Sequence, residues 1–287
     1  MENFAGLKGA FTDYQESKFF ILPVPYSTRN DWNPMANNAP EAIIEASQHL
    51  EYFDTETRKQ VWRKGIHTLE PLNNLNSDEK VCEQVENKVS EIISLDKFPV
   101  VIGGNRTVSI GAARAAANKY KNLTVIQFCA HNAMRVNYKC SEYSPECAMY
   151  HIKQLAPLVQ IGTRAMSADG ERNADPAKMF FARDIFFDQE NRWFKEVYEE
   201  LTENTYITID VDVLDPSVMP FVSVPEPGGL QYFTLIRILK SIFRRSNVVG
   251  FDIVGLCPNH SNLAPNYLVA RLIYQMMTYK ALYSYKL

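Results

Sequence analysis

The sequence predicts a three-layer α/β/α fold with a mainly parallel sheet, built as one domain over residues 1–287. Short runs rich in β-branched and aromatic residues alternate with stretches of helical pattern. The strand-like runs are almost continuously apolar, which is typical of parallel strands covered by helices on both faces. No Gly/Ser-rich linker, charge block or internal repeat divides the chain, so we expect a single domain.

The strands are expected where short apolar runs carry β-branched or aromatic residues. These runs are FFILP at 19–23, FPVVI at 98–102, LTVIQF at 123–128, LVQI at 158–161, YITI at 206–209 and VVGFDI at 248–253. Helices are expected between them, where apolar residues recur at helical spacing, at 41–49, 78–93, 108–120, 191–201, 233–243 and 267–282. Right-handed crossovers would bring the carboxyl ends of the strands to one edge of the sheet, where ligands bind in such folds.

Composition argues against several classes of partner. The formal net charge is −3, so no sequence-wide basic field exists to hold nucleic acid or an anionic membrane surface. No apolar run approaches the roughly 18 residues that span a bilayer, and no basic segment followed by an apolar stretch opens the chain. The five cysteines are odd in number and widely spread, which does not suit a disulfide framework. We therefore expect a cytoplasmic protein.

Polar residues follow three of the predicted strands. Asp210 and Asp212 lie two apart, so an extended strand would place both carboxylates on one face, and Cys129 and His131 share this spacing. Together they could form a tetrahedral set for a divalent metal. The alternatives are a strand entering a turn at Asp215, a small buried Cys129 and a buried, hydrogen-bonded His131.

These segments resemble the ureohydrolase superfamily of arginases, agmatinases and formimidoylglutamases. The resemblance spans most of the chain and is most specific at residues 209–230, which follow the family pattern SxDxDxxDPxxxPxxxxPxPGGL. Weaker matches are residues 103–107 to the GGDHS element, 129–133 to DAHxD and 159–164 to the GIR strand. The resemblance implies an arginase-like fold and two manganese ions, bridged by a hydroxide that attacks a guanidinium or amidine carbon.

Six positions usually hold the two ions in this family, and the resemblance implies that this site is degraded here. His131, Asp210 and Asp212 match the family residues, whereas Arg106 replaces a histidine and Cys129 and Ala133 replace aspartates. Beyond the ligands, the family's YSHG element becomes Tyr-Ser-Pro-Glu at residues 143–146. Pro145 therefore replaces the histidine that is thought to shuttle protons, and Glu146 stands beside it. Gly255 replaces the glutamate that would hold the substrate guanidinium.

Arg106 cannot coordinate a metal, because its guanidinium stays protonated and has no available lone pair. We expect it to fill the vacated volume and to bind Asp210 bidentately. Cys129, His131, Asp210 and Asp212 could still form a single metal site, and the thiolate would favour zinc over manganese. The formal charges of this group of residues can sum to zero with one divalent ion bound, and they can also sum to zero with none. The sequence therefore leaves open whether the protein carries a cofactor.

The coordinated losses favour a protein that has lost the dinuclear hydrolase reaction and acts as a binding, regulatory or structural subunit. By resemblance it would form a homo-oligomer, a trimer or hexamer, or join an active paralogue. The alternative is a hydrolase of a linear C–N bond in a guanidino or amidine compound, with one metal at Cys129, His131, Asp210 and Asp212. Glu146 is then the substitute base.

A nucleotide-binding protein is a weaker third hypothesis. Gly103 and Gly104 follow a predicted strand and precede a predicted helix. The segment lacks a third glycine and a P-loop lysine, so it is not a dinucleotide or P-loop signature. Arg106 adds positive charge at a helix start only in the general sense of an anion site.

Overall fold

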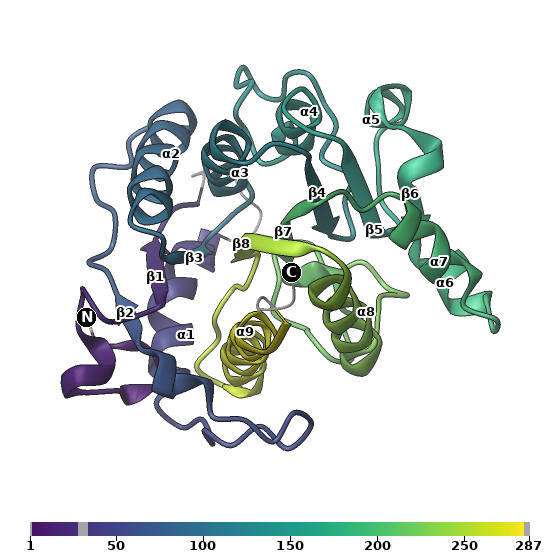
Figure 1. The fold of residues 1–287 in the computed structure, drawn as a ribbon. Coiled ribbons are helices and arrows are strands. Elements are labelled where there is room, and N and C mark those ends of the chain that lie inside the picture. The colour runs from purple at the N-terminus through teal and green to yellow at the C-terminus, as the bar shows by residue number, and fades with distance from the viewer. Residues whose placement is uncertain (1, 28–33, 284–287) are drawn as a thin grey trace.

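An eight-stranded sheet runs through the centre of the molecule (Figure 1). The computed structural model describes residues 2–27 and 34–283. The strands are β1 (Phe19–Val24), β2 (Ile66–Thr68), β3 (Phe98–Gly103), β4 (Leu123–Phe128), β5 (Leu158–Thr163), β6 (Met179–Phe181), β7 (Asn204–Asp210) and β8 (Asn247–Val254). Their order is β2-β1-β3-β8-β7-β4-β5-β6, and every pairing between them is parallel.

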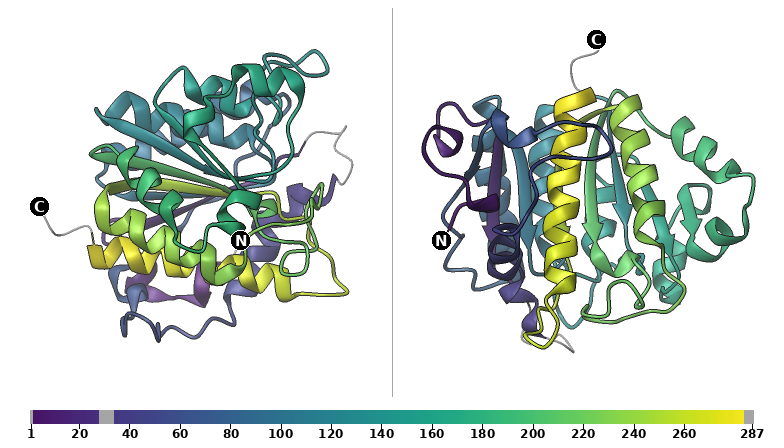
Figure 2. Two further views of the ribbon diagram at one scale, coloured as in Figure 1. Left: turned by 90° about the vertical axis from the view of Figure 1, so that its right-hand side faces the viewer. Right: turned by 90° about the horizontal axis from the view of Figure 1, so that it is seen from below.

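Helices cover both faces of the sheet, as Figure 2 shows. They are α1 (Ala39–Ser47), α2 (Asp78–Ser94), α3 (Thr107–Lys119), α4 (Ala148–Lys153), α5 (Ala168–Asn173), α6 (Ala182–Phe187), α7 (Arg192–Glu199), α8 (Tyr232–Arg245) and α9 (Ala264–Tyr283). Buried residues of α2, α3 and α4 form one hydrophobic core with the sheet, and those of α1, α8 and α9 contribute to the other. The three-layer α/β/α prediction is confirmed, and the sheet is wholly parallel.

The longer elements form where the apolar pattern is strong. In α2, Val81, Val85, Val89 and Ile92 are buried at helical spacing, and Ser77 caps the helix by accepting a hydrogen bond from the amide of Lys80 at 3.2 Å. All six predicted strands and six predicted helices are present within a few residues. The sequence did not predict β2, β6, α4, α5 and α6, because three to six residues are too few to show a period.

The strand order places four carboxyl ends side by side in the middle of the sheet. β3, β8, β7 and β4 are consecutive neighbours, and they end at Gly103, Val254, Asp210 and Phe128. The loops that follow these strands carry the polar residues singled out in the sequence. No helix in the described part of the chain is long and apolar enough to cross a membrane.

Candidate functional site

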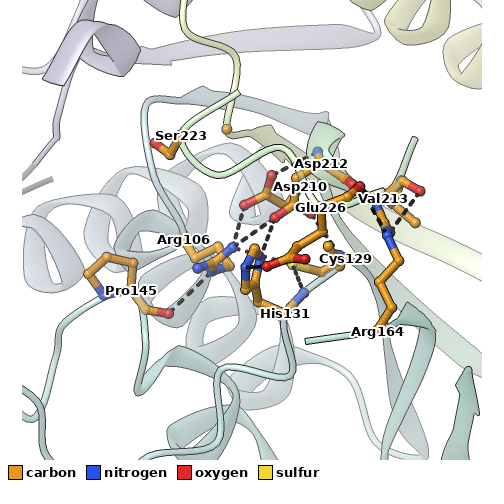
Figure 3. A network of polar contacts seen from close by, with 12 residues as sticks. Arg106, Cys129, His131, Pro145, Arg164, Asp210, Asp212, Val213, Ser223 and Glu226 are labelled. Atoms are coloured by element: carbon orange, nitrogen blue, oxygen red, sulfur yellow. Dashed lines mark hydrogen bonds and ion pairs between the residues drawn. The ribbon is translucent and has the colours of Figure 1, made fainter. Parts of the chain in front are cut away.

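The guanidinium of Arg106 lies among two carboxylates and a thiol (Figure 3). Its Nη1 is 2.6 Å from Oδ2 of Asp210, 3.5 Å from Oδ2 of Asp212 and 3.3 Å from Sγ of Cys129. Its Nε donates to the carbonyl of Pro145 at 3.3 Å. The expected bidentate contact with Asp210 is wrong, because Nη1 alone reaches that carboxylate while Nε is directed to Pro145.

The two aspartates are fixed by the local backbone as well as by Arg106. Asp210 ends β7, and its Oδ1 accepts a hydrogen bond from the amide of Asp212 at 3.0 Å. Oδ1 of Asp212 accepts from the amide of Ala130 at 2.8 Å, and its Oδ2 contacts Nδ1 of His131 at 2.8 Å. Each carboxylate oxygen therefore has a partner, as buried charges require.

Cys129 and His131 lie on the strand-end segment after β4. Cys129 is buried, and its Sγ accepts a hydrogen bond from the amide of His131 at 3.2 Å. The His131 ring is partly exposed, with Nε2 3.9 Å from Oε1 of Glu226. Cys129 is thus buried, which was one of the alternatives that the sequence left open. His131 lies between Asp212 and solvent.

Burial and neighbouring charges separate the pKa values of the two aspartates. Burial, reinforced by the charge of Asp212, raises the pKa of Asp210 to about 7. Burial acts upward on Asp212 as well, but the hydrogen bond and charge of His131, together with Arg106, hold the pKa of Asp212 below its usual range. Burial raises the pKa of the Cys129 thiol well above its usual value, which keeps this sulfur a neutral thiol near pH 7.

Gly255 gives Asp210 the room to take this position. Its amide donates to the carbonyl of Gly104 at 2.9 Å, which fixes the segment after β8 beside the segment after β3. A Cβ at position 255 would lie 2.0 Å from Oδ1 of Asp210. Gly255 therefore lies directly against the buried ion pair. This is the position that the resemblance compares with a substrate-binding glutamate.

Arg164, at the right of Figure 3, supports the site through backbone carbonyls. Its Nη2 donates to the carbonyls of Asp212 at 2.8 Å and Glu226 at 2.7 Å, and its Nε donates to that of Pro227 at 2.9 Å. These bonds tie the segment after β7 to the loop that carries Glu226. The sequence matched Arg164 to a family strand but gave no sign of this role, because backbone acceptors leave no side-chain pattern.

The cluster lines a cavity of about 450 Å³. The words 'the cavity' refer to it from this point on. Of the nine predicted site residues, eight line it: Arg106, His131, Ala133, Pro145, Glu146, Asp210, Asp212 and Gly255. Cys129 is the exception, since it lies beneath the others. The sequence missed further lining residues, among them Asn105, Arg135, Tyr138 and Glu226. Of these, Arg135 and Tyr138 belong to the loop after β4.

The residues present do not fit a pair of metal ions. Ala133 offers no donor, and the Arg106 guanidinium lies where a second cation would need ligands. The residues fit a single ion better than a pair, because ligand atoms of Cys129, His131 and Asp212 lie within 4.8 Å of one another. Asp210 is not part of that group. A thiol, an imidazole and a carboxylate suit zinc, but Arg106 already contacts two of the three.

The parallel α/β sheet, with clustered aspartates and a histidine at its central strand ends, agrees with the ureohydrolase class that the sequence resembles. The chain belongs to the arginase family, whose model matches residues 17–278. It is 30% identical to the N(1)-aminopropylagmatine ureohydrolase of Synechocystis sp. over 94% of this chain and 91% of that protein. A protein of the same name from Thermus thermophilus is 32% identical, over 94% of this chain and 93% of that protein.

Solved structures share the fold. The agmatine ureohydrolase of Thermoplasma volcanium superposes with a TM-score of 0.87 at 24% identity, over 98% of this chain and 94% of that one. The formimidoylglutamase of Bacillus subtilis gives 0.83 at 22% identity, over 93% and 88%. The resemblance seen in the sequence is therefore confirmed at the level of family and fold.

Proposed function

We propose that this arginase-family protein has lost dinuclear hydrolase activity and binds a small molecule in the cavity. The observation that carries the proposal is the position of Nη1 of Arg106, 2.6 Å from Asp210 and 3.3 Å from Cys129. A fixed cation of the protein thus neutralises carboxylates that would otherwise attract metal ions. The pair is buried, with 14% of the Arg106 side chain and 7% of the Asp210 side chain exposed.

The remaining chemical roles of a two-metal hydrolase also lack residues. Such a reaction needs bridging carboxylates that hold the ions about 4 Å apart and a metal-bound water with a lowered pKa. Cys129 has a thiol where the reaction needs a bridging carboxylate, and Ala133 has no donor. Pro145 cannot transfer a proton, and Gly255 cannot hold a guanidinium. No described residue of the cavity therefore supplies these roles in the usual form.

A second candidate is a hydrolase of a linear C–N bond that uses one metal ion. It is favoured by the grouping of Cys129, His131 and Asp212 within 4.8 Å, and by the relatives that are named as ureohydrolases. A bound ion would supply Lewis-acid activation of water. For this chain to hold the ion, Arg106 would have to leave Cys129 and Asp212, and Glu146, which lines the cavity, would be the base.

Metal content and urea release distinguish the two candidates. The purified protein would be incubated with manganese and zinc, desalted and analysed by elemental mass spectrometry, and then assayed with arginine and agmatine. We expect metal near zero and no urea. About one zinc per chain, with turnover that Cys129→Ser abolishes, would establish the second candidate. Manganese-dependent urea release with about two ions per chain would refute the loss of the dinuclear site.

A homo-oligomer, trimer or hexamer, or a complex with an active paralogue remains part of the proposal, as does a cytoplasmic location. Phe186 and Phe187 support association, because their side chains are exposed at 79% and 71% on α6. Light scattering on the protein alone and mixed with a paralogue would measure the mass directly. A monomer under both conditions would contradict this part of the proposal.

A further inference from the structure

Lys280 is a buried lysine that lies far from the cavity along the strands. Only 9% of the residue is exposed, near the end of α9. Its Nζ contacts Asn247, the first residue of β8, whereas Gly255, which lines the cavity, follows the last residue of that strand. The length of β8 therefore separates Lys280 from the cavity, by roughly 25 Å. The surroundings of this lysine are independent of the proposed function.

A chain of side-chain amides holds the Lys280 amine. Nζ of Lys280 donates a hydrogen bond to Oδ1 of Asn247 at 3.0 Å. Nδ2 of Asn247 donates to Oδ1 of Asn204 at 2.8 Å, and Nδ2 of Asn204 donates to the backbone carbonyl of Lys121 at 2.8 Å. Because the last acceptor is a backbone carbonyl, each amide can donate in only one direction, and Asn247 presents its oxygen to Lys280. The amine is thus fixed by an uncharged acceptor.

The Lys280 amine has no carboxylate partner among the described residues. Its Nζ lies 5.2 Å from the ring centroid of Phe98, and Asn247 is uncharged. Lys18 lies near enough to repel a positive charge on Lys280, and its own Nζ donates to the backbone carbonyl of Asp96 at 3.0 Å. Burying an ammonium without a counter-ion is costly. Burial, with a smaller contribution from Lys18, therefore lowers the pKa of Lys280 to about 8.

A lysine amine reacts with electrophiles only when it has lost its proton, and lysines act as nucleophiles where they are desolvated or lie beside another cation. At pH 7 the free amine makes up about 10% of a group with a pKa of about 8, and about 0.04% of an ordinary lysine. The reagent must be small, because only 9% of Lys280 is exposed. A product that carries negative charge would be stabilised by Lys18. Carbon dioxide meets both conditions.

We propose that Lys280 is a site of reversible carbamate formation with carbon dioxide. The nitrogen lone pair forms a bond to the carbon, the electron pair of one C=O π bond moves to that oxygen, and the nitrogen gives one proton to water. Nothing is oxidised or reduced. The N–H of the carbamate can still donate to Oδ1 of Asn247, and its negative charge lies near the positive charge of Lys18. The reaction thus replaces a repulsion between two cations by an attraction.

Chemical trapping tests the proposal on the intact protein. The protein is equilibrated near neutral pH with carbon dioxide and bicarbonate that carry a heavy carbon isotope, alkylated with triethyloxonium ion, which converts carbamates into stable esters, and digested for mass spectrometry. We expect at least about tenfold more isotope on Lys280 than on Lys195, of which 83% of the side chain is exposed. In urea-unfolded protein the two levels should become equal. No isotope on Lys280, or equal levels in the folded protein, would overturn the proposal.

Two variants test the contacts of the amine. Asn247→Asp places a carboxylate against Nζ, favours the protonated amine and should lower the isotope on Lys280 by about tenfold or more. Lys18→Met removes the cation beside the product and should also lower it, whereas Lys195→Met, the matched control, should leave it unchanged. Thermal unfolding establishes that each variant is folded. Wild-type levels in folded Asn247→Asp or in Lys18→Met would overturn the proposal, and Lys18→Met decides if the aspartate prevents folding.

Discussion

Asp210 and Gly255 fit together because position 255 has no side chain. A Cβ there would lie 2.0 Å from Oδ1 and 2.7 Å from Cγ of Asp210. Gly255 also has φ of +91°, a conformation that residues with a side chain rarely adopt. In this arrangement, a side chain at position 255 and the ion pair of Asp210 with Arg106 exclude each other.

Gly255→Ala should therefore destabilise the protein by more than its backbone conformation explains. We expect a loss of about 3 kcal/mol in the free energy of unfolding, from left-handed strain and from displacement of Asp210. Gly228→Ala is the matched control, because Gly228 has φ of +78° but nothing within 4 Å of its Cβ position. Its loss should be about 1 kcal/mol by urea denaturation. Equal losses would show that Asp210 moves away without cost.

Removing the Arg106 charge should leave buried carboxylates without a counter-ion. Arg106→Met is expected to cost about 3–5 kcal/mol, and the double variant with Asp210→Asn should recover part of it. Arg183→Met, at an ion pair in which 79% of the arginine side chain is exposed, should cost about 0.5 kcal/mol or less. Thermal and urea unfolding of the wild type, the two single variants and the double variant would measure these losses in stability. A double variant less stable than the single one would contradict the expected coupling.

Arg164 should stabilise the loop that carries Glu226. Arg164→Gln removes charged donors from the carbonyls of Asp212, Glu226 and Pro227, and we expect a loss of about 2 kcal/mol or more. Hydrogen exchange would report the local effect at the amide of Gly229, which donates to Asp215 at 3.1 Å. The control is Arg172→Gln, on a side chain that is 70% exposed. Unchanged exchange at Gly229 would count against this role.

Asp252 makes stability depend on pH. Its side chain is fully buried, its Oδ1 accepts hydrogen bonds from Ser109 and Thr208, both at 2.7 Å, and burial raises its pKa to about 6. Since this exceeds the unfolded value of about 3.9, the folded state holds the proton more tightly. The contribution of protonated Asp252 to the stability of the folded state is therefore complete below about pH 4, and it is lost as the pH rises through about 6.

Asp252→Asn should remove that dependence. Between about pH 4 and pH 7, the wild type should lose about 2 kcal/mol in the free energy of unfolding relative to the variant. Urea titrations of both proteins across this range would measure the difference at each pH, so that contributions from other groups cancel. A difference that stays constant with pH would mean that Asp252 does not titrate there.

The sequence was most informative where a residue's role follows from its place in a strand or motif. Asp210 and Asp212 could be located because they end a predicted strand, and the loss of a donor at Ala133 follows from its side chain alone. Arg135 could not be found in this way, because its place at the cavity depends on the path of the loop after β4. The single-nitrogen contact of Arg106 depends on where the Pro145 carbonyl lies, which no spacing specifies.

Arg106 joins the start of α3 to the ends of β4 and β7 through one guanidinium. In a metalloprotein such a junction exists only after an ion has been acquired, and a chelator can undo it. Here the positive charge is part of the polypeptide and is present from synthesis. Under the proposed function, assembly of this part of the protein draws nothing from the cell's supply of metal, and starvation for metal would leave it intact.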